Sequence, residues 1–368
     1  MYSYAQRGLH ANVGFLAGWL LLLDYLLIPP LLYIYAAMAL NHLYPDIPKF
    51  GFILVFLVSA TLVNLRGISF TARLNMLFLL AQLVVLGIFL TCAWEALHAG
   101  TGHGELTVAP LYNPAQFNFA LMMQAVSIAV LSFLGFDAIS TLAEETRGDA
   151  GRSIGRAALI SLLIMGGIFV AQTWLATDLA AGMGFTSADT AFYEIAAIAG
   201  GDWLASLTAV TTALAWGVAV SIPSQAAVSR LLFGMARDGK LSRVLAKVHP
   251  TYRTPHLSIY LVAVMSLVIC YLFINSVDTL TSLVNFGALS GFMILHLTVI
   301  NYHWRRQKSG NVLLHLVAPA TGFVIVAAIM FNMGLDAQKL GCLWIVAGVI
   351  YLILLNRKGA NLVLSKHI

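Results

Sequence analysis

Charged side chains are scarce in this sequence: only 10% of the 368 residues are Asp, Glu, Lys or Arg, whereas 60% are hydrophobic. A soluble domain of this length needs far more charge on its surface, so the composition excludes one. Long polar windows are also missing, which leaves no room for a soluble domain between the apolar runs. This balance is typical of an α-helical protein that crosses a membrane several times.

Cysteine is rare as well, and Cys92, Cys270 and Cys342 each lie in a separate apolar run. Their spacing indicates neither a disulfide framework nor a zinc site. The histidines form no metal-ligand cluster, and the sequence contains no nucleophile motif, P-loop or dinucleotide fingerprint. We therefore expect no enzyme, no metal and no cofactor.

Apolar runs dominate what is present, and about ten of them approach the ~20 residues that a spanning helix needs. They cover residues 13–40, 50–66, 73–95, 118–146, 155–177, 203–234, 257–274, 279–303, 313–333 and 341–356. The sequence thus predicts an all-α membrane protein, with residues 1–368 forming a single transmembrane domain. Residues 178–202 mix Gly, Ser, Asp and Thr, and we expect a loop there with a short helix over an outer vestibule.

The lysines and arginines predict the orientation of these helices. If residues 1–12 are cytoplasmic, all of the 20 basic residues except Lys49 and Lys339 fall on the cytoplasmic side. This asymmetry is the positive-inside rule, and it places both termini in the cytoplasm. It also explains the net charge of +5 without nucleic acid as a partner.

One stretch, residues 132–145, holds polar groups that a spanning helix normally lacks. Gly135 loosens the helix between two aromatic residues, and Asp137 is a good N-cap for a new half-helix. A helix broken at this depth exposes backbone carbonyls and a positive dipole end, and such backbone is tolerated where it lines a cavity. We interpret the stretch as a small-solute site near the bilayer midplane; the alternative is a packing glycine beside a structural acid.

Three other acidic residues and one tyrosine are candidates for the same function. Asp24 lies near the middle of the first span, where it either attracts a cation or bonds a neighbouring helix. Tyr25 offers a hydroxyl and an aromatic face to an ammonium group, or simply packs. Glu144 and Glu145 lie near the cytoplasmic end of their span, where they pair with arginines or form an inner gate.

Several further polar or helix-breaking residues lie inside the spans. Pro29 and Pro30 should kink or locally unwind the first one. Gln82, Trp216 and Asn285 are expected to pack between helices, because polar residues in membrane helices more often do so than bind ligands.

These motifs resemble the amino acid–polyamine–organocation transporter superfamily, and within it bacterial putrescine importers. The resemblance covers nearly the whole chain. It is carried by Tyr2–Arg7, Val13–Phe15, Gly18-Trp19, Leu23–Leu26, Ser132–Asp137, Thr141-Leu142, Glu144-Glu145, Val228–Leu232, Ala236–Asp238, His249-Pro250, Arg253–Pro255, Asn285–Ala288 and Trp304–Arg306.

The resemblance implies a LeuT-like fold with two inverted repeats and twelve helices. The opening residues resemble the loop before the family's third helix, so the chain would hold family helices three to twelve and be amino-terminally truncated. Some proton-coupled relatives carry a lysine at about the place of Gln82, so its absence leaves the proton path unassigned.

The implied function is secondary import of putrescine or a related small organic cation across the cytoplasmic (inner) membrane, coupled to protons. In that reading Asp24, Tyr25 and the segment Phe133, Leu134, Gly135, Phe136 and Asp137 bind the substrate. A cationic or neutral amino acid permease and a non-transporting membrane fragment are the alternatives.

Overall fold

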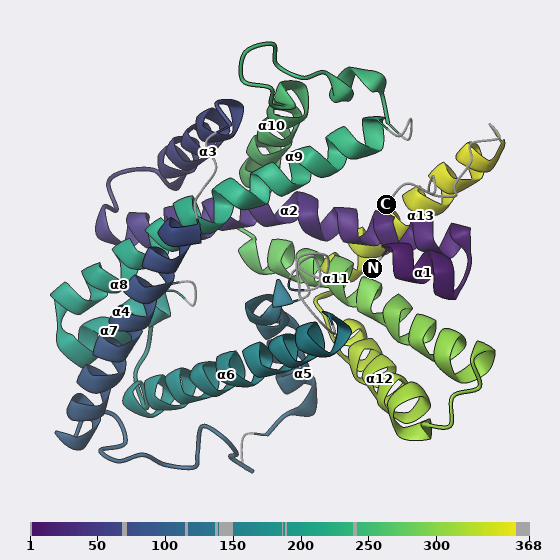
Figure 1. The fold of residues 1–368 in the computed structure, drawn as a ribbon. Helices are drawn as coiled ribbons and strands as arrows, with labels where there is room; N and C mark the ends of the chain where they lie inside the picture. Colours follow the sequence, from purple (N-terminus) through teal and green to yellow (C-terminus); the bar gives the residue numbers. More distant parts are fainter. Residues whose placement is uncertain are drawn as a thin grey trace. The chain divides into compact units, whose positions relative to one another are not determined.

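The computed structural model describes residues 2–67, 72–114, 117–136, 139, 150–185, 187, 190–237 and 241–357. These residues form helices joined by turns and loops, without a β-strand among them, which confirms the all-α prediction. The α-helices, labelled in Figure 1, are α1 (Tyr2–Gly8), α2 (Ala11–Leu43), α3 (Lys49–Leu65), α4 (Ala72–His98), α5 (Phe119–Ala129), α6 (Ala150–Leu179), α7 (Ala191–Gly200), α8 (Asp202–Leu214), α9 (Ser221–Arg237), α10 (His256–Phe273), α11 (Val277–Val299), α12 (Ala318–Phe331) and α13 (Leu335–Arg357). Short 3-10 segments occur at η1 (Val130–Phe133) and η4 (Arg243–Ala246), and π-helical segments at η3 (Ala215–Val220), η5 (Ile300–Arg306) and η6 (Leu313–Val317).

Each of the ten predicted apolar runs contains a helix. Within the described residues, eight helical segments are long and apolar enough to cross a membrane by length and composition. The runs 50–66 and 118–146 contain the shorter helices α3 and α5. A helix satisfies its own backbone hydrogen bonds, so it is the structure that such apolar runs adopt in lipid.

Backbone packing divides the chain into two units. The first unit comprises Met1–Ile28, Asn118–Ser132 and Ser276–Ile368, and the second comprises Pro29–Phe117 and Phe133–Asn275. In the first unit α11 packs against α1, α5, α12 and α13. In the second, α4 packs against α6, α7 and α8, while α3, α9 and α10 pack against one another.

The core of the second unit shows why α4, α6, α7 and α8 associate. Phe89, Leu97, Leu179 and Leu204 are fully buried together, and small residues such as Ala93 and Ala196 let the helices approach closely. The short helix expected within residues 178–202 is α7. It packs against α4, α6 and α8.

The helix α2 continues through Pro29 and Pro30, so the local unwinding expected there is absent. Each proline removes one backbone donor, yet the next turn is held by Tyr33 and Ile34, whose side chains are fully buried. The thiol of Cys270 in α10 also donates to the carbonyl of Pro30, at 3.5 Å. Packing around this turn therefore keeps the helix intact despite the two missing backbone donors.

Candidate functional site

The helix that leads into the polar stretch 132–145 ends before Gly135, and most of the stretch beyond Phe136 lies outside the described residues. Asn118 begins the helix by accepting hydrogen bonds from the backbone N–H groups of Ala120 and Leu121. The α-helix ends at Ala129, a 3-10 turn follows over Val130–Phe133, and Gly135 has a φ of +104°. Only glycine adopts such a backbone readily, and no heavy atom lies within 4 Å of the position that a Cβ would take. Gly135 is thus required by the turn and not by close packing.

The segment just before and after this break is partly buried. Phe133, Leu134 and Phe136 are each neither fully enclosed nor fully exposed. The ring of Phe133 lies edge-on to the ring of Phe169 in α6, with centroids 5.4 Å apart. The predicted site residues Asp137, Glu144 and Glu145 lie outside the described residues.

Asp24 and Tyr25 belong to the first unit, whereas Phe133 to Phe136 belong to the second. Asp24 is buried, with 8% of its surface exposed, and Tyr25 is half-buried. A Cβ added at Gly287 of α11 would lie only 2.9 Å from the backbone nitrogen of Asp24. Asp24 therefore occupies a point where α2 and α11 nearly touch.

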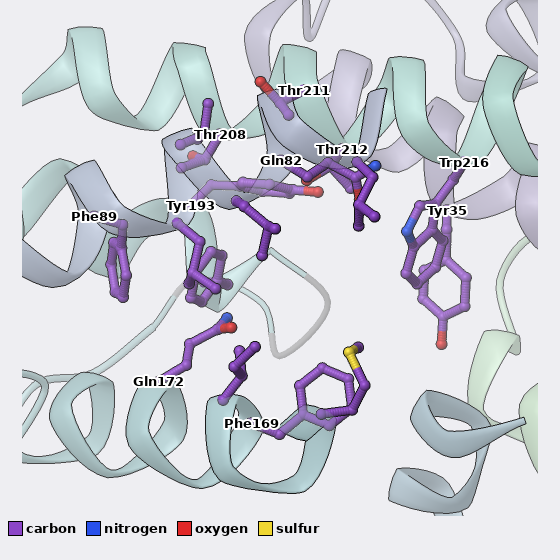
Figure 2. Close-up of a pocket in the computed structure, with 17 residues that line it drawn as sticks. Tyr35, Gln82, Phe89, Phe169, Gln172, Tyr193, Thr208, Thr211, Thr212 and Trp216 are labelled. Atoms are coloured by element: carbon purple, nitrogen blue, oxygen red, sulfur yellow. The ribbon is translucent and has the colours of Figure 1, made fainter. Parts of the chain in front are cut away.

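A cavity of about 410 Å³ lies inside the second unit, and Figure 2 shows the side chains that surround it. Its walls come from α2, α4, α6, α7, α8 and η3. The apolar part of the wall includes Phe89 and Phe169. Since Phe169 also contacts Phe133, one wall residue of the cavity touches the segment just before Gly135.

The polar part of the cavity wall is uncharged among the described lining residues. It consists of two carboxamides, five hydroxyl-bearing side chains (two tyrosines and three threonines) and one indole. The residues are Gln82, Gln172, Tyr35, Tyr193, Thr208, Thr211, Thr212 and Trp216. Thr208 donates its hydroxyl proton to the carbonyls of Leu204 and Ala205, so its oxygen can still accept a hydrogen bond from another donor. Such a wall suits a solute that needs hydrogen bonds and aromatic contact.

Tyr193 on α7 is held as a neutral phenol. Burial raises the pKa of Tyr193 to about 12, while a hydrogen bond with Thr212 acts in the opposite direction. The phenol therefore keeps its proton at neutral pH.

Tyr35 and Trp216 form an aromatic corner of the cavity. Their ring centroids lie 4.6 Å apart with the planes at 88°. Trp216 lies in the π-helical segment η3, and Gly217 beside it leaves room for the ring of Phe56. A π-helical turn shifts the side chains that follow it and is frequent at functional sites. Faces of tyrosine and tryptophan attract organic cations.

Sequence reasoning missed most of this wall. Gln82 and Trp216 were expected only to pack, and Tyr35, Gln172 and the threonines of α8 were not singled out. The signal was present in the spacing, because Thr208, Thr211 and Thr212 fall on one helical face. Threonine is nevertheless common in membrane helices, where it bonds its own backbone.

Long apolar helices around a partly polar cavity define a multi-pass membrane protein built to hold a solute. A family model described as "Amino acid permease" matches residues 1–355, and the chain belongs to this family. It is 32% identical to the low-affinity putrescine importer PlaP of Escherichia coli (strain K12) over 98% of this chain and 80% of the relative. It is 25% identical to the branched-chain amino acid permease BcaP of Bacillus subtilis (strain 168), over 98% and 80%. A methylthioribose transporter of the same organism is 24% identical, over 97% of this chain and 79% of the relative. These relatives are transporters and not enzymes.

Proposed function

We propose that this protein is a secondary transporter that imports putrescine or a related small organic cation across the cytoplasmic membrane, coupled to protons, with both termini in the cytoplasm. The observation that carries the proposal is the end of the helix before Gly135, where Gly135 has a positive φ and the neighbouring Phe133 contacts a wall residue of the cavity. The resemblance to a putrescine importer along nearly the whole chain supports the choice of substrate.

The proposed binding chemistry uses the groups that a helix break frees. Backbone carbonyls of Phe133 and Leu134 accept hydrogen bonds from an ammonium group, because they are not fully used by the helix. Phe136 and Tyr25 cover the alkyl chain, and Asp24 or Asp137 balances the charge. Glu144 and Glu145 pair with arginines at the inner end.

A second candidate, import of a neutral amino acid, is favoured by one specific observation. None of the described residues that line the cavity carries a formal charge. A solute without net charge loses less hydration free energy on entering such a cavity than a diamine does. The likeness to a branched-chain amino acid permease agrees with this alternative.

Uptake measurements on cells that express the full gene product separate these functions. Labelled putrescine, arginine and leucine are compared, each with and without a protonophore. Saturable putrescine uptake that the protonophore abolishes supports the proposal, and uptake of leucine alone supports the second candidate. No uptake of any of the three contradicts both and favours a non-transporting membrane protein.

The proposal that Asp24 or Asp137 balances the charge of the substrate is tested with separate variants. Asp24→Asn and Asp137→Asn keep the size of each side chain and remove its charge. The assignment is wrong if both variants take up putrescine with an unchanged KM.

A further inference from the structure

The helix α11 is the buried centre of the first unit. Every residue from Leu280 to Gly291 is buried, so this part of α11 has neighbours on all sides. A membrane helix enclosed in this way normally carries apolar side chains only. Polar side chains on it therefore need a specific explanation.

Asn285 has such an explanation on one side of its carboxamide. The residue is fully buried, and its Nδ2 donates to the carbonyl of Ser127 at 2.6 Å and to that of Ile128 at 3.3 Å. Both carbonyls belong to the last turn of α5. The last four carbonyls of an α-helix lose their i+4 donors. The Val130 N–H points to the carbonyl of Ile128, and Asn285 adds side-chain donors at the place where the α-helix stops.

The oxygen of the carboxamide has no donor among the residues that the structure describes. Asn285 Oδ1 is buried and makes no hydrogen bond with any described residue. Turning the amide over would place two carbonyl oxygens against Oδ1, so the two contacts with α5 fix its orientation. Burying an unsatisfied oxygen is unfavourable, and the contacts with Ser127 and Ile128 must outweigh that cost.

The same stretch of α11 also meets α2. Gly287 lies two residues beyond Asn285, and a Cβ there would lie 2.9 Å from both the carbonyl of Leu20 and the nitrogen of Asp24. Within the first unit, α11 thus contacts the backbone of α2 at Asp24 and the end of α5 that leads to Gly135.

We propose that Asn285 is a positioning residue for transport: its two hydrogen bonds determine where α5 stops being α-helical, and so where the broken segment begins. The proposal rests on the proposed function only for its transport readout. Without the donor, the carbonyls of Ser127 and Ile128 take backbone partners further along the chain, and the break moves.

The variants differ in how many donors they keep. Asn285→Leu has a similar size and no donor. Asn285→Asp, protonated in this buried place, keeps one O–H donor and rescues part of the effect. Ser290→Ala is the matched control, because Ser290 is on the same helix, buried, and its Oγ also makes no hydrogen bond with a described residue.

Uptake kinetics of the full gene product give the first readout. We expect Asn285→Leu to raise the KM for the transported solute about tenfold, Asn285→Asp to raise it less, and Ser290→Ala to leave it unchanged. A merely structural role would lower the amount of folded protein and leave the KM of the remainder unaltered. Equal KM values for all three variants overturn the proposal.

The second readout does not depend on transport. Ser132 lies exposed in η1, so Ser132→Cys is labelled by a small methanethiosulfonate reagent in a background where the accessible Cys92 and Cys342 are replaced by alanine. We expect Asn285→Leu to change the labelling rate about fivefold or more and Ser290→Ala to leave it unaltered. If the unsubstituted protein transports none of the three solutes, the proposed function fails while labelling still decides the role of Asn285. An unchanged rate in both Asn285 variants refutes that role.

Discussion

The ring of Phe133 meets the ring of Phe169 edge-on, with centroids 5.4 Å apart and planes at 88°. Phe133 is the last residue of the 3-10 turn before Gly135, and Phe169 forms part of the cavity wall. Pairs of this geometry stabilise by about 0.5–1.5 kcal/mol beyond the area they bury. The contact fixes the broken segment against α6 and makes both rings targets for mutation.

Removing the Phe169 ring should loosen the broken segment. We expect Phe169→Ala to raise the KM for uptake about tenfold, because it enlarges the cavity and releases Phe133. Gly166→Ala is the control one turn earlier, since its added Cβ would lie an ordinary 3.7 Å from the Phe133 ring. A normal KM in Phe169→Ala, measured with equal amounts of protein in the membrane, would contradict this role.

Gly135 is needed for its backbone angle alone. Gly135→Ala should destabilise the protein by about 1–3 kcal/mol and reduce uptake, because a residue with a side chain is disfavoured at a φ of +104°. Crowding is not the reason, since the space around the added methyl group is empty. Gly87→Ala in the middle of α4 also adds a methyl group into open space, but there the backbone is helical. That control should be neutral or slightly stabilising. Thermal unfolding in detergent compares the two, and equal melting temperatures would show that the turn is not strained by a side chain.

The comparison of Gly135 with Pro29-Pro30 shows which breaks can be predicted from sequence. Both sites carry residues that disfavour a helix, yet only at the first does the described helix end. Local chemistry decides at Gly135, where the positive φ needs glycine. At Pro29 and Pro30, packing around the next turn outweighs the lost hydrogen bonds, and this packing depends on the tertiary structure.

The helices themselves could be predicted because their lengths follow from apolar runs. The cavity could not, because its wall combines single side chains from six separate elements. The same applies to Asn285, which was expected to pack between helices. It does so, but the identity of its partners at Ser127 and Ile128 depends on the tertiary structure.

Adding one negative charge to the cavity tests which solute enters it. Gln172 lines the cavity from α6, and Gln172→Glu keeps its shape. A carboxylate attracts an ammonium strongly in a site shielded from water. We expect the ratio of putrescine to leucine uptake to rise about tenfold, and Gln172→Leu to lower it. An unchanged ratio in competition assays would mean that the solute does not approach this wall.

Asp178 at the end of α6 holds the loop that follows α4. It is fully buried, accepts from the hydroxyl and the N–H of Thr107 at 2.6 and 2.8 Å, and lies 2.7 Å from His103 Nδ1. Asp178→Asn replaces one acceptor oxygen with a donor that faces these groups. We expect a loss of about 3 kcal/mol and faster cleavage after Glu105 by a glutamate-specific protease. Asp336→Asn removes an exposed carboxylate that pairs with Lys339 at 3.5 Å, and it should leave both measurements unchanged.

The strongest coupling in the first unit should be found between Trp19 of α2 and Trp344 of α13. Each indole N–H donates to the backbone carbonyl of the other residue, at 2.9 and 3.0 Å, and the rings stack with centroids 4.6 Å apart. Trp19→Phe and Trp344→Phe each remove one indole N–H donor. Each also weakens the remaining hydrogen bond, because the stacking of the two rings aligns both N–H groups with their carbonyls. The double variant should therefore lose less stability than the sum of the single variants, by about 0.5–3 kcal/mol. Chemical unfolding of the four proteins in one detergent gives this value. Strictly additive losses would show that the two hydrogen bonds form independently and that the stack does not link them.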